Sequence, residues 1–314
     1  MEFWNSTLDS DFILVGILNK SEHPNLICAT IGILCMLALT SNSLLLLVIT
    51  VDVRLHVPMY FLLSQLSLMD LMFATIITPK TISDYLSGQN TISFAGCTFQ
   101  MLLILSLGGA EDLLLAFMAY DRYVAICHPL NYMILMRPKI CWLMVATSWT
   151  TAFINAVIHT SYTMHFPFCM SREINHLTCE IPHLLKLACA DTSQYKFMVY
   201  VMGVIFLIPT LSAILASYTF VLVAILNMSV GEGRHKTLIT CSSHLTVVGM
   251  YYGAAVLMYV LPTSYHSPKQ DNILSAFYII ITPALNPLIY SLRNKEVMGA
   301  LRRVFGRFIS VQQR

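Results

Sequence analysis

The chain has 314 residues, of which 57% are hydrophobic and 11% are charged, and its formal net charge is +2. Its mean hydropathy of +0.70 lies far above that of water-soluble domains, which excludes a soluble globular fold. A lipid bilayer is therefore the expected surrounding, and nucleic acid is not expected as a partner.

Apolar windows long enough to cross a bilayer as helices recur along the chain. A span needs about 20 mainly apolar residues, and seven windows qualify: 26–50, 59–82, 97–127, 140–162, 197–228, 238–261 and 273–292. The sequence predicts an all-α membrane protein, a seven-transmembrane helix bundle with a short C-terminal amphipathic helix. The expected parts are an extracellular segment 1–25, the bundle 26–292 and a cytoplasmic tail 293–314.

The distribution of basic residues predicts the orientation. Lys and Arg are retained on the cytoplasmic side of short loops, and 12 of the 18 lie inside if the N-terminus is outside. A glycosylation sequon at Asn5 agrees with this topology. The tail combines Arg302, Arg303 and Arg307 with apolar residues, which is typical of an interfacial helix on an anionic leaflet. We expect a plasma-membrane protein with an extracellular N-terminus.

Four cysteines fall in the predicted outer segments: Cys97, Cys169, Cys179 and Cys189. They can pair in three ways, and a bridge from Cys97 would hold the loop 163–194 over the bundle. The segment 176–180, HLTCE, offers imidazole, thiolate and carboxylate groups to a metal ion. A bridged Cys179 has no thiolate to give, so the disulfide interpretation is favoured.

The charged pair Asp121 and Arg122 stands at the inner end of the third span, where we expect it to face the cytoplasm. Arg122 alone could reach the lipid headgroups, as long basic side chains do at helix ends. That interpretation gives the adjacent Asp121 no purpose. A charge whose partner changes between two states explains both residues, so a switch is predicted.

Two more acids, Asp70 and Glu111, lie in the middle of different spans. A bound sodium ion or a shared proton would relieve their repulsion. Alternatively, each is a protonated carboxyl that bonds neighbours such as Asn42, Ser67 and Asn286. The sequence leaves both interpretations open.

Several motifs in order identify a family resemblance: MAYDRYVAIC at 118–127, PMYF at 58–61, TCSSH at 240–244 after Lys236, and NPLIYSLRN at 286–294. With them, nearly the whole chain resembles the olfactory branch of the rhodopsin-like, class A G-protein-coupled receptors. Departures from the branch pattern occur at Ser41, Val57 and 237–239, outside the switch residues.

The resemblance implies an odorant receptor, not an enzyme, that activates a stimulatory, olfactory-type G protein and raises cyclic AMP. It implies Cys97–Cys179 and Cys169–Cys189 bridges and no cofactor beyond the possible sodium ion at Asp70 and Glu111. It also implies these switch residues: Asp121, Arg122, Tyr123, Tyr218, Asn286, Pro287 and Tyr290. A secondary transporter that uses the two buried acids is the alternative function, and the scattered histidines disfavour an enzyme.

Alignment with the family also implies a ligand pocket in the outer half of the bundle. Its expected residues are Met101, Ile104, Leu105, Gly108, Asn155, His159, Met202, Phe206, Tyr252, Ala255 and Tyr259. The adjacent Gly108 and Gly109 fit either close helix packing or a ligand-shaped gap. No acid is apparent at the outer third or fifth helix, so a small neutral volatile ligand is expected rather than an amine.

Overall fold

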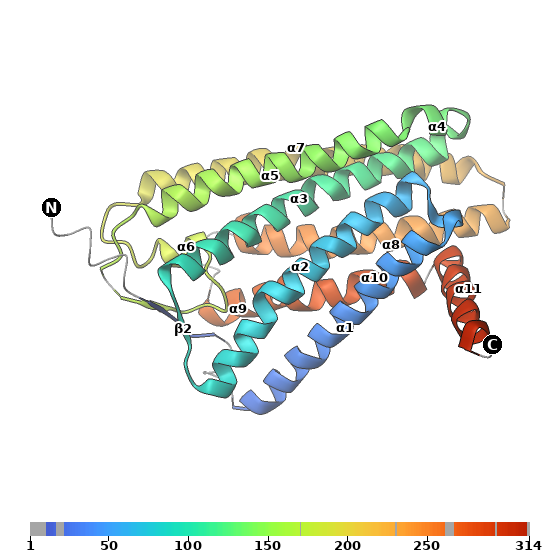
Figure 1. Ribbon diagram of the computed structural model, residues 1–314. Coiled ribbons are helices and arrows are strands. Elements are labelled where there is room, and N and C mark those ends of the chain that lie inside the picture. Colours follow the sequence, from blue (N-terminus) through green and yellow to red (C-terminus); the bar gives the residue numbers. More distant parts are fainter. Residues whose placement is uncertain are drawn as a thin grey trace.

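The computed structural model describes residues 11–16, 22–169, 171–229, 231–260, 267–292 and 294–312, and nearly all of them are helical. The long helices lie side by side in one bundle (Figure 1). They are α1 (Pro24–Val51), α2 (Pro58–Ser87), α3 (Phe94–Cys127), α5 (Pro138–Met164), α7 (Ser193–Asn227) and α8 (Glu232–Ala255), followed by the segments α9 (Pro268–Ala276), η6 (Phe277–Ile281) and α10 (Thr282–Leu292).

Short elements complete the chain. They are β1 (Phe12–Leu14), η2 (Val53–Leu55), β2 (Thr91–Ile92), η3 (Pro129–Asn131), α4 (Tyr132–Leu135), β3 (Glu173–Ile174), α6 (Ile181–Leu184), η4 (Val256–Val260) and α11 (Lys295–Gln312). Strands and α6 gather at one end of the bundle, which we call the disulfide end, and α4 and α11 lie at the other, the α11 end (Figure 1).

Local sequence explains where the long helices start. Pro24, Pro58 and Pro138 occupy the first turns of α1, α2 and α5, where a missing backbone N–H costs no hydrogen bond. The side chain of Ser93 caps α3 by accepting from the Gly96 amide at 3.0 Å. Gly88 ends α2 with a φ of 67°, a left-handed conformation that glycine adopts without a steric penalty.

Six helices in the described residues are long and apolar enough to cross a membrane. The seventh place in the bundle belongs to α8, which continues into the π-helix η4. The mean hydropathy of α8 is low because its α11 end carries Glu232, Arg234 and Lys236. With these residues, α8 begins before the predicted window 238–261. The seven-helix architecture is confirmed, although most helices extend past their apolar windows.

The bundle has its apolar packing inside and further apolar side chains outside. Tyr60, Phe73 and Leu114 are almost completely buried in the main core. Ile33, Phe153 and Phe220, among others, are more than half or about half exposed, as lipid-facing side chains are. α3 lies at the centre, since it packs on α2, α5 and α7.

A three-stranded sheet at the disulfide end was not predicted. β1 pairs antiparallel with β2 and parallel with β3. Strands of two or three residues carry no recognisable alternation, and their partners lie far apart in the chain, so sequence periodicity gives no signal for them. The sheet attaches residues 12–14 to the loop that covers the bundle.

Candidate ligand-binding site

A cavity of about 210 Å³ lies between α3, α5, α7 and α8, beneath the loop that carries α6. α3 and α5 contribute Met101, Ile104, Leu105, Gly108, Asn155 and His159, and α7 and α8 contribute Met202, Phe206 and Ala255. All nine belong to the pocket that the family resemblance implies, and the structure places them around one cavity. The apolar wall suits a small, oily molecule.

The two remaining residues of the expected pocket have different outcomes. Tyr252 is buried but does not line the cavity, where its neighbour Tyr251 stands instead. Consecutive helical positions differ by about 100° around the axis, so alignment with a straight helix cannot choose between the two. The side chain of Tyr259 lies outside the described residues.

Two acids that were not predicted, Asp112 and Glu180, also stand in the cavity wall. Asp112 lies one turn further along α3 than Gly108, and its side chain is 4% exposed. Glu180 directly precedes α6, whose Ile181 and Pro182 also line the cavity. The outer turns of α3 and α7 carry no acid, as expected, but a loop and a deeper turn of α3 each bring a carboxyl group to the cavity.

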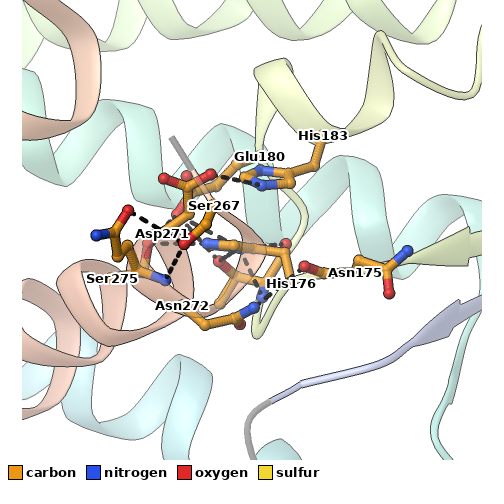
Figure 2. Close-up of polar contacts among 10 residues, drawn as sticks. Asn175, His176, Glu180, His183, Ser267, Asp271, Asn272 and Ser275 are labelled. Atoms are coloured by element: carbon orange, nitrogen blue, oxygen red, sulfur yellow. Dashed lines mark hydrogen bonds and ion pairs between the residues drawn. The ribbon is translucent and has the colours of Figure 1, made fainter. Parts of the chain in front are cut away.

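A polar cluster joins the covering loop to α9 (Figure 2). Ser275 on α9 contacts His176 Nε2 at 2.9 Å and donates to Glu180 Oε1 at 3.2 Å. His183 stacks on His176 with ring centroids 4.1 Å apart, and its Nε2 lies 3.8 Å from Asp271. The sequence suggested scattered histidines, but these two lie together. Their cluster holds Glu180 at the cavity wall.

Both disulfides that the family resemblance implied are present, Cys97–Cys179 and Cys169–Cys189. Spacing alone had left three pairings open. Gln100 Oε1 also accepts from the Cys179 amide at 2.9 Å, so α3 holds the loop at two adjacent points. Cys179 is bridged and has no thiolate for a metal, while His176, Glu180 and His183 carry potential ligand atoms within 4.8 Å of one another.

At the α11 end, Arg122 Nη2 lies 2.5 Å from Asp121 Oδ2. Tyr132 of α4 donates to the other carboxylate oxygen at 2.8 Å. Asp121 is 1% exposed, so the expectation that this pair faces the cytoplasm is wrong for the acid. The reason is that α4 packs across the end of α3 and covers it.

A second, smaller cavity of about 30 Å³ is lined by Arg122, His244 and Tyr290, among others. Tyr218 on α7 and His244 on α8 are hydrogen-bonded at 2.8 Å beside it. Tyr123, by contrast, contacts His128 at 2.9 Å and does not join the Asp121–Arg122 pair in the described contacts. The Arg122 guanidinium thus lies where α3, α8 and α10 meet.

The mid-bundle acids have separate partners. Asn286 Nδ2 donates to both oxygens of Asp70 at 3.2 Å, and Tyr278 donates to Glu111 at 3.1 Å. Asn42 instead donates to the carbonyls of Ala38 and Pro283. Both carboxyl groups are buried, and Glu111 Oε1 has no hydrogen-bond partner among the described residues. Pro287, beside Asn286, stands inside α10.

Two ion pairs outside the spans attach α11. Arg303 donates to Asp52, the residue after α1, at 2.6 Å, and this bond lowers the pKa of the Asp52 carboxyl. Lys236 on α8 donates to Glu296 at 2.5 Å and lowers the pKa of that carboxyl. Tyr60 donates to the other Glu296 oxygen at 2.9 Å. α11 is therefore connected to α1, α2 and α8.

Three features together define a rhodopsin-like receptor. They are seven membrane-crossing helices, a cavity under a disulfide-held loop, and a buried Asp-Arg pair at the opposite end. Residues 31–307 match the olfactory receptor family. The human olfactory receptors 2AG1 and 2AG2 are 69% and 68% identical to the chain over 309 residues, 98% of the chain and of each relative. Human olfactory receptor 2T27 is 52% identical over 310 residues, 99% of this chain and 98% of the relative.

The chain therefore belongs to the olfactory receptor family of multi-pass membrane proteins. Membership makes it an odorant receptor, neither an enzyme nor a transporter, and G-protein coupling follows from the family.

Proposed function

We propose that a small neutral odorant binds in the cavity between α3, α5, α7 and α8. The location and character of the cavity support this proposal. It lies under a loop held by Cys179, and its wall is mainly apolar. Burying the apolar surface of a ligand stabilises the complex by about 25 cal/mol per Å² before the costs of association.

The disulfide end faces the outside of the cell in this proposal, and the chain resides in the plasma membrane. The two bridges favour the oxidising side, and most of the basic residues belong to the opposite end. Asn5, outside the described residues, would carry a glycan. An N-terminal epitope accessible to antibody in intact cells is the expected result, and access only after permeabilisation would contradict it.

Signalling follows from a change at the α11 end. Ligand binding shifts an equilibrium only through different affinities for two states, so the cavity must tighten as the inner end of α8 moves outward. Arg122 would then leave Asp121 and meet the C-terminal helix of a stimulatory, olfactory-type G protein, as a helix in a groove. This rearrangement takes place among the other predicted switch residues, with Tyr123 at its edge. They are Tyr218, Asn286, Pro287 and Tyr290.

The test is a cyclic AMP assay in cells that express the olfactory G protein, with an odorant panel. Arg122→Ala should abolish the response, because no other guanidinium in the described residues lines the small cavity. Receptor at the surface is measured in parallel, so that lost expression is not mistaken for lost signalling. A normal response of Arg122→Ala at equal surface level would remove the switch assignment.

We also propose that Asp70 and Glu111 share a sodium ion in the resting state. Both acids are almost completely buried, and in the part of the chain that the structure describes Glu111 Oε1 lacks a hydrogen-bond partner that an ion would supply. Replacing external sodium with a large organic cation should then raise basal cyclic AMP in the unchanged receptor but not in Asp70→Asn. An equal response in both proteins would favour separate protonated carboxyls.

A further inference from the structure

Asp112 lies at the floor of the ligand cavity because of the glycines before it. A helical side chain leans over the turn on its N-terminal side, and for Asp112 that turn contains Gly108 and Gly109. A Cβ at Gly109 would lie 3.1 Å from that of Ala152, and one at Gly108 would lie 3.2 Å from the Tyr278 hydroxyl. The glycines thus place no side chain of their own over that turn, where Ala152 and Tyr278 approach α3 closely, and both line the cavity together with Asp112.

The hydrogen bonds of Asp112 are incomplete. Its Oδ1 lies 3.1 Å from the Thr210 hydroxyl, and its Oδ2 is buried without a hydrogen-bond partner. Other polar groups in the wall are occupied: Tyr251 donates to the Gly108 carbonyl at 2.7 Å, and His159 contacts Tyr195 at 3.2 Å. Among the buried side-chain oxygens and nitrogens that the structure describes in this wall, Asp112 Oδ2 alone lacks a partner.

The surroundings determine which form of the carboxyl is present. The described wall contains no Lys or Arg, and an unpaired ionised carboxylate at this depth in a membrane is costly. The Thr210 hydroxyl has one hydrogen, and the carbonyls of Phe206 and Leu207 lie closer to it, at 2.8 and 3.0 Å, than Asp112 does. A neutral acid that donates its own proton from Oδ1 to Thr210 accounts for the 3.1 Å contact between these two groups. Oδ2 is then an acceptor only.

We infer that Asp112 Oδ2 accepts a hydrogen bond from the ligand, and that the receptor therefore prefers odorants with a hydroxyl group on an apolar body. This inference rests on the proposed function of the same cavity. An ether or ester has no hydrogen to donate to Oδ2, and it leaves that oxygen unpaired. An ammonium could pair with the ionised acid, but burying both ions in this apolar wall costs a desolvation free energy that a neutral alcohol avoids.

The position of Asp112 also connects the ligand to the moving helices. Thr210 belongs to α7, and Tyr251 on α8 donates to the carbonyl of Gly108, one turn before Asp112. A hydroxyl bound at Oδ2 therefore acts at the junction of α3, α7 and α8. A ligand that fills only the outer part of the cavity does not reach this junction.

The test uses matched ligands and two readouts. A panel presents each alkyl or aryl skeleton as the alcohol, the methyl ether and the primary amine, and is applied to receptor in nanodiscs for thermal stabilisation and to cells for cyclic AMP. Alcohols should bind at least about tenfold more tightly than their ethers, the value of one hydrogen bond to an otherwise unpaired buried oxygen.

Three variants make the result specific. Asp112→Leu should lose the preference for alcohols while its ether affinity stays unchanged. Asp112→Asn should keep it, because its amide donates to Thr210 and its carbonyl replaces Oδ2. Glu180→Gln, the control at the other acid in the wall, should also keep the preference.

Equal binding of alcohols and ethers to the unchanged receptor, or a preference that survives in Asp112→Leu, would overturn the inference. So would a preference for amines that disappears in Asp112→Asn, which would show an ionised carboxylate. If alcohols stabilise the receptor selectively but give no cyclic AMP response, the role of Asp112 in ligand binding is supported and the proposed signalling is contradicted.

Discussion

The Tyr132 hydroxyl stabilises the resting Asp121–Arg122 pair at the α11 end. Asp121 receives Arg122 on one oxygen and Tyr132 on the other, and it is buried between them. Hydrogen bonds to charged groups contribute about 1.5–3 kcal/mol. Tyr132 therefore stabilises the state in which the carboxylate retains the guanidinium, and burial raises the pKa of its hydroxyl, which keeps it a donor at all physiological pH values.

Tyr132→Phe should raise basal cyclic AMP about tenfold or more, because it removes only the hydroxyl that steadies Asp121. Tyr123→Phe is the matched control, since that hydroxyl contacts His128 and not the pair. Basal signal per receptor at the surface is the measurement. Equal basal signals in the two variants would contradict the role of Tyr132.

At the scale of elements, two links join α8 to α11, and they differ in quality. Lys236 and Glu296 lie 2.5 Å apart, and Tyr60 supports the acid from α2. Lys295 and Glu232 lie 4.0 Å apart with both side chains almost fully exposed. Only the first link is expected to restrain the inner end of α8.

Lys236→Met should therefore raise basal cyclic AMP, by at most about fivefold, because a solvent-exposed ion pair contributes about 0.2–1 kcal/mol. Lys295→Met, the control for the weaker link, should leave the basal signal unchanged. High salt during nucleotide-exchange measurements should reduce the difference between Lys236→Met and the unchanged receptor. A larger effect for Lys295→Met would contradict this ranking.

The pH dependence of the Lys236–Glu296 link has a definite sign. The folded-state pKa of Glu296 is lowered from its ordinary value of 4.5, with the Lys236 bond as the main cause. The link is therefore fully present above pH 4.5 and is lost only as the pH falls through the lowered value. The effect of Lys236→Met should be constant between pH 6 and 8.

Elements also show where sequence-based prediction succeeded and where it failed. Hydropathy located the spans because a membrane requires about 20 apolar residues whatever the packing. It could not place Glu180, whose approach to the cavity depends on the Cys97–Cys179 bridge and on Ser275 of α9. It also could not choose Tyr251 over Tyr252, because adjacent positions on α8 point about 100° apart and the π-helix η4, which begins at Val256, interrupts the regular helical phase nearby.

Asp112 is the most instructive omission. In the sequence GGAED at 108–112, the predictions concern the two glycines and Glu111 and give Asp112 no role. Yet two glycines one turn before an acid on the same helix predict a carboxyl reached over bare backbone. That signal becomes decisive only when α5 and α7 are known to leave a space beside it.

At the scale of the whole molecule, the two sites lie at opposite ends of α3. The cavity adjoins Met101 to Asp112, and the Arg122 pair follows about 15 Å further along the helix, at 1.5 Å per residue. α7 and α8 contribute to both ends, through Phe206 and Ala255 at the cavity and through Tyr218 and His244 near Arg122. A ligand and a G protein can thus favour the same rearrangement without touching each other.

The distance between the inner ends of α3 and α8 tests this coupling most directly. Probes placed on the exposed residues His128 and His235 report it in nanodiscs, with and without an odorant that saturates the cavity. The account predicts a longer distance with the odorant, and the largest with odorant and G protein together. An unchanged distance in a receptor that binds the odorant and promotes nucleotide exchange would contradict it.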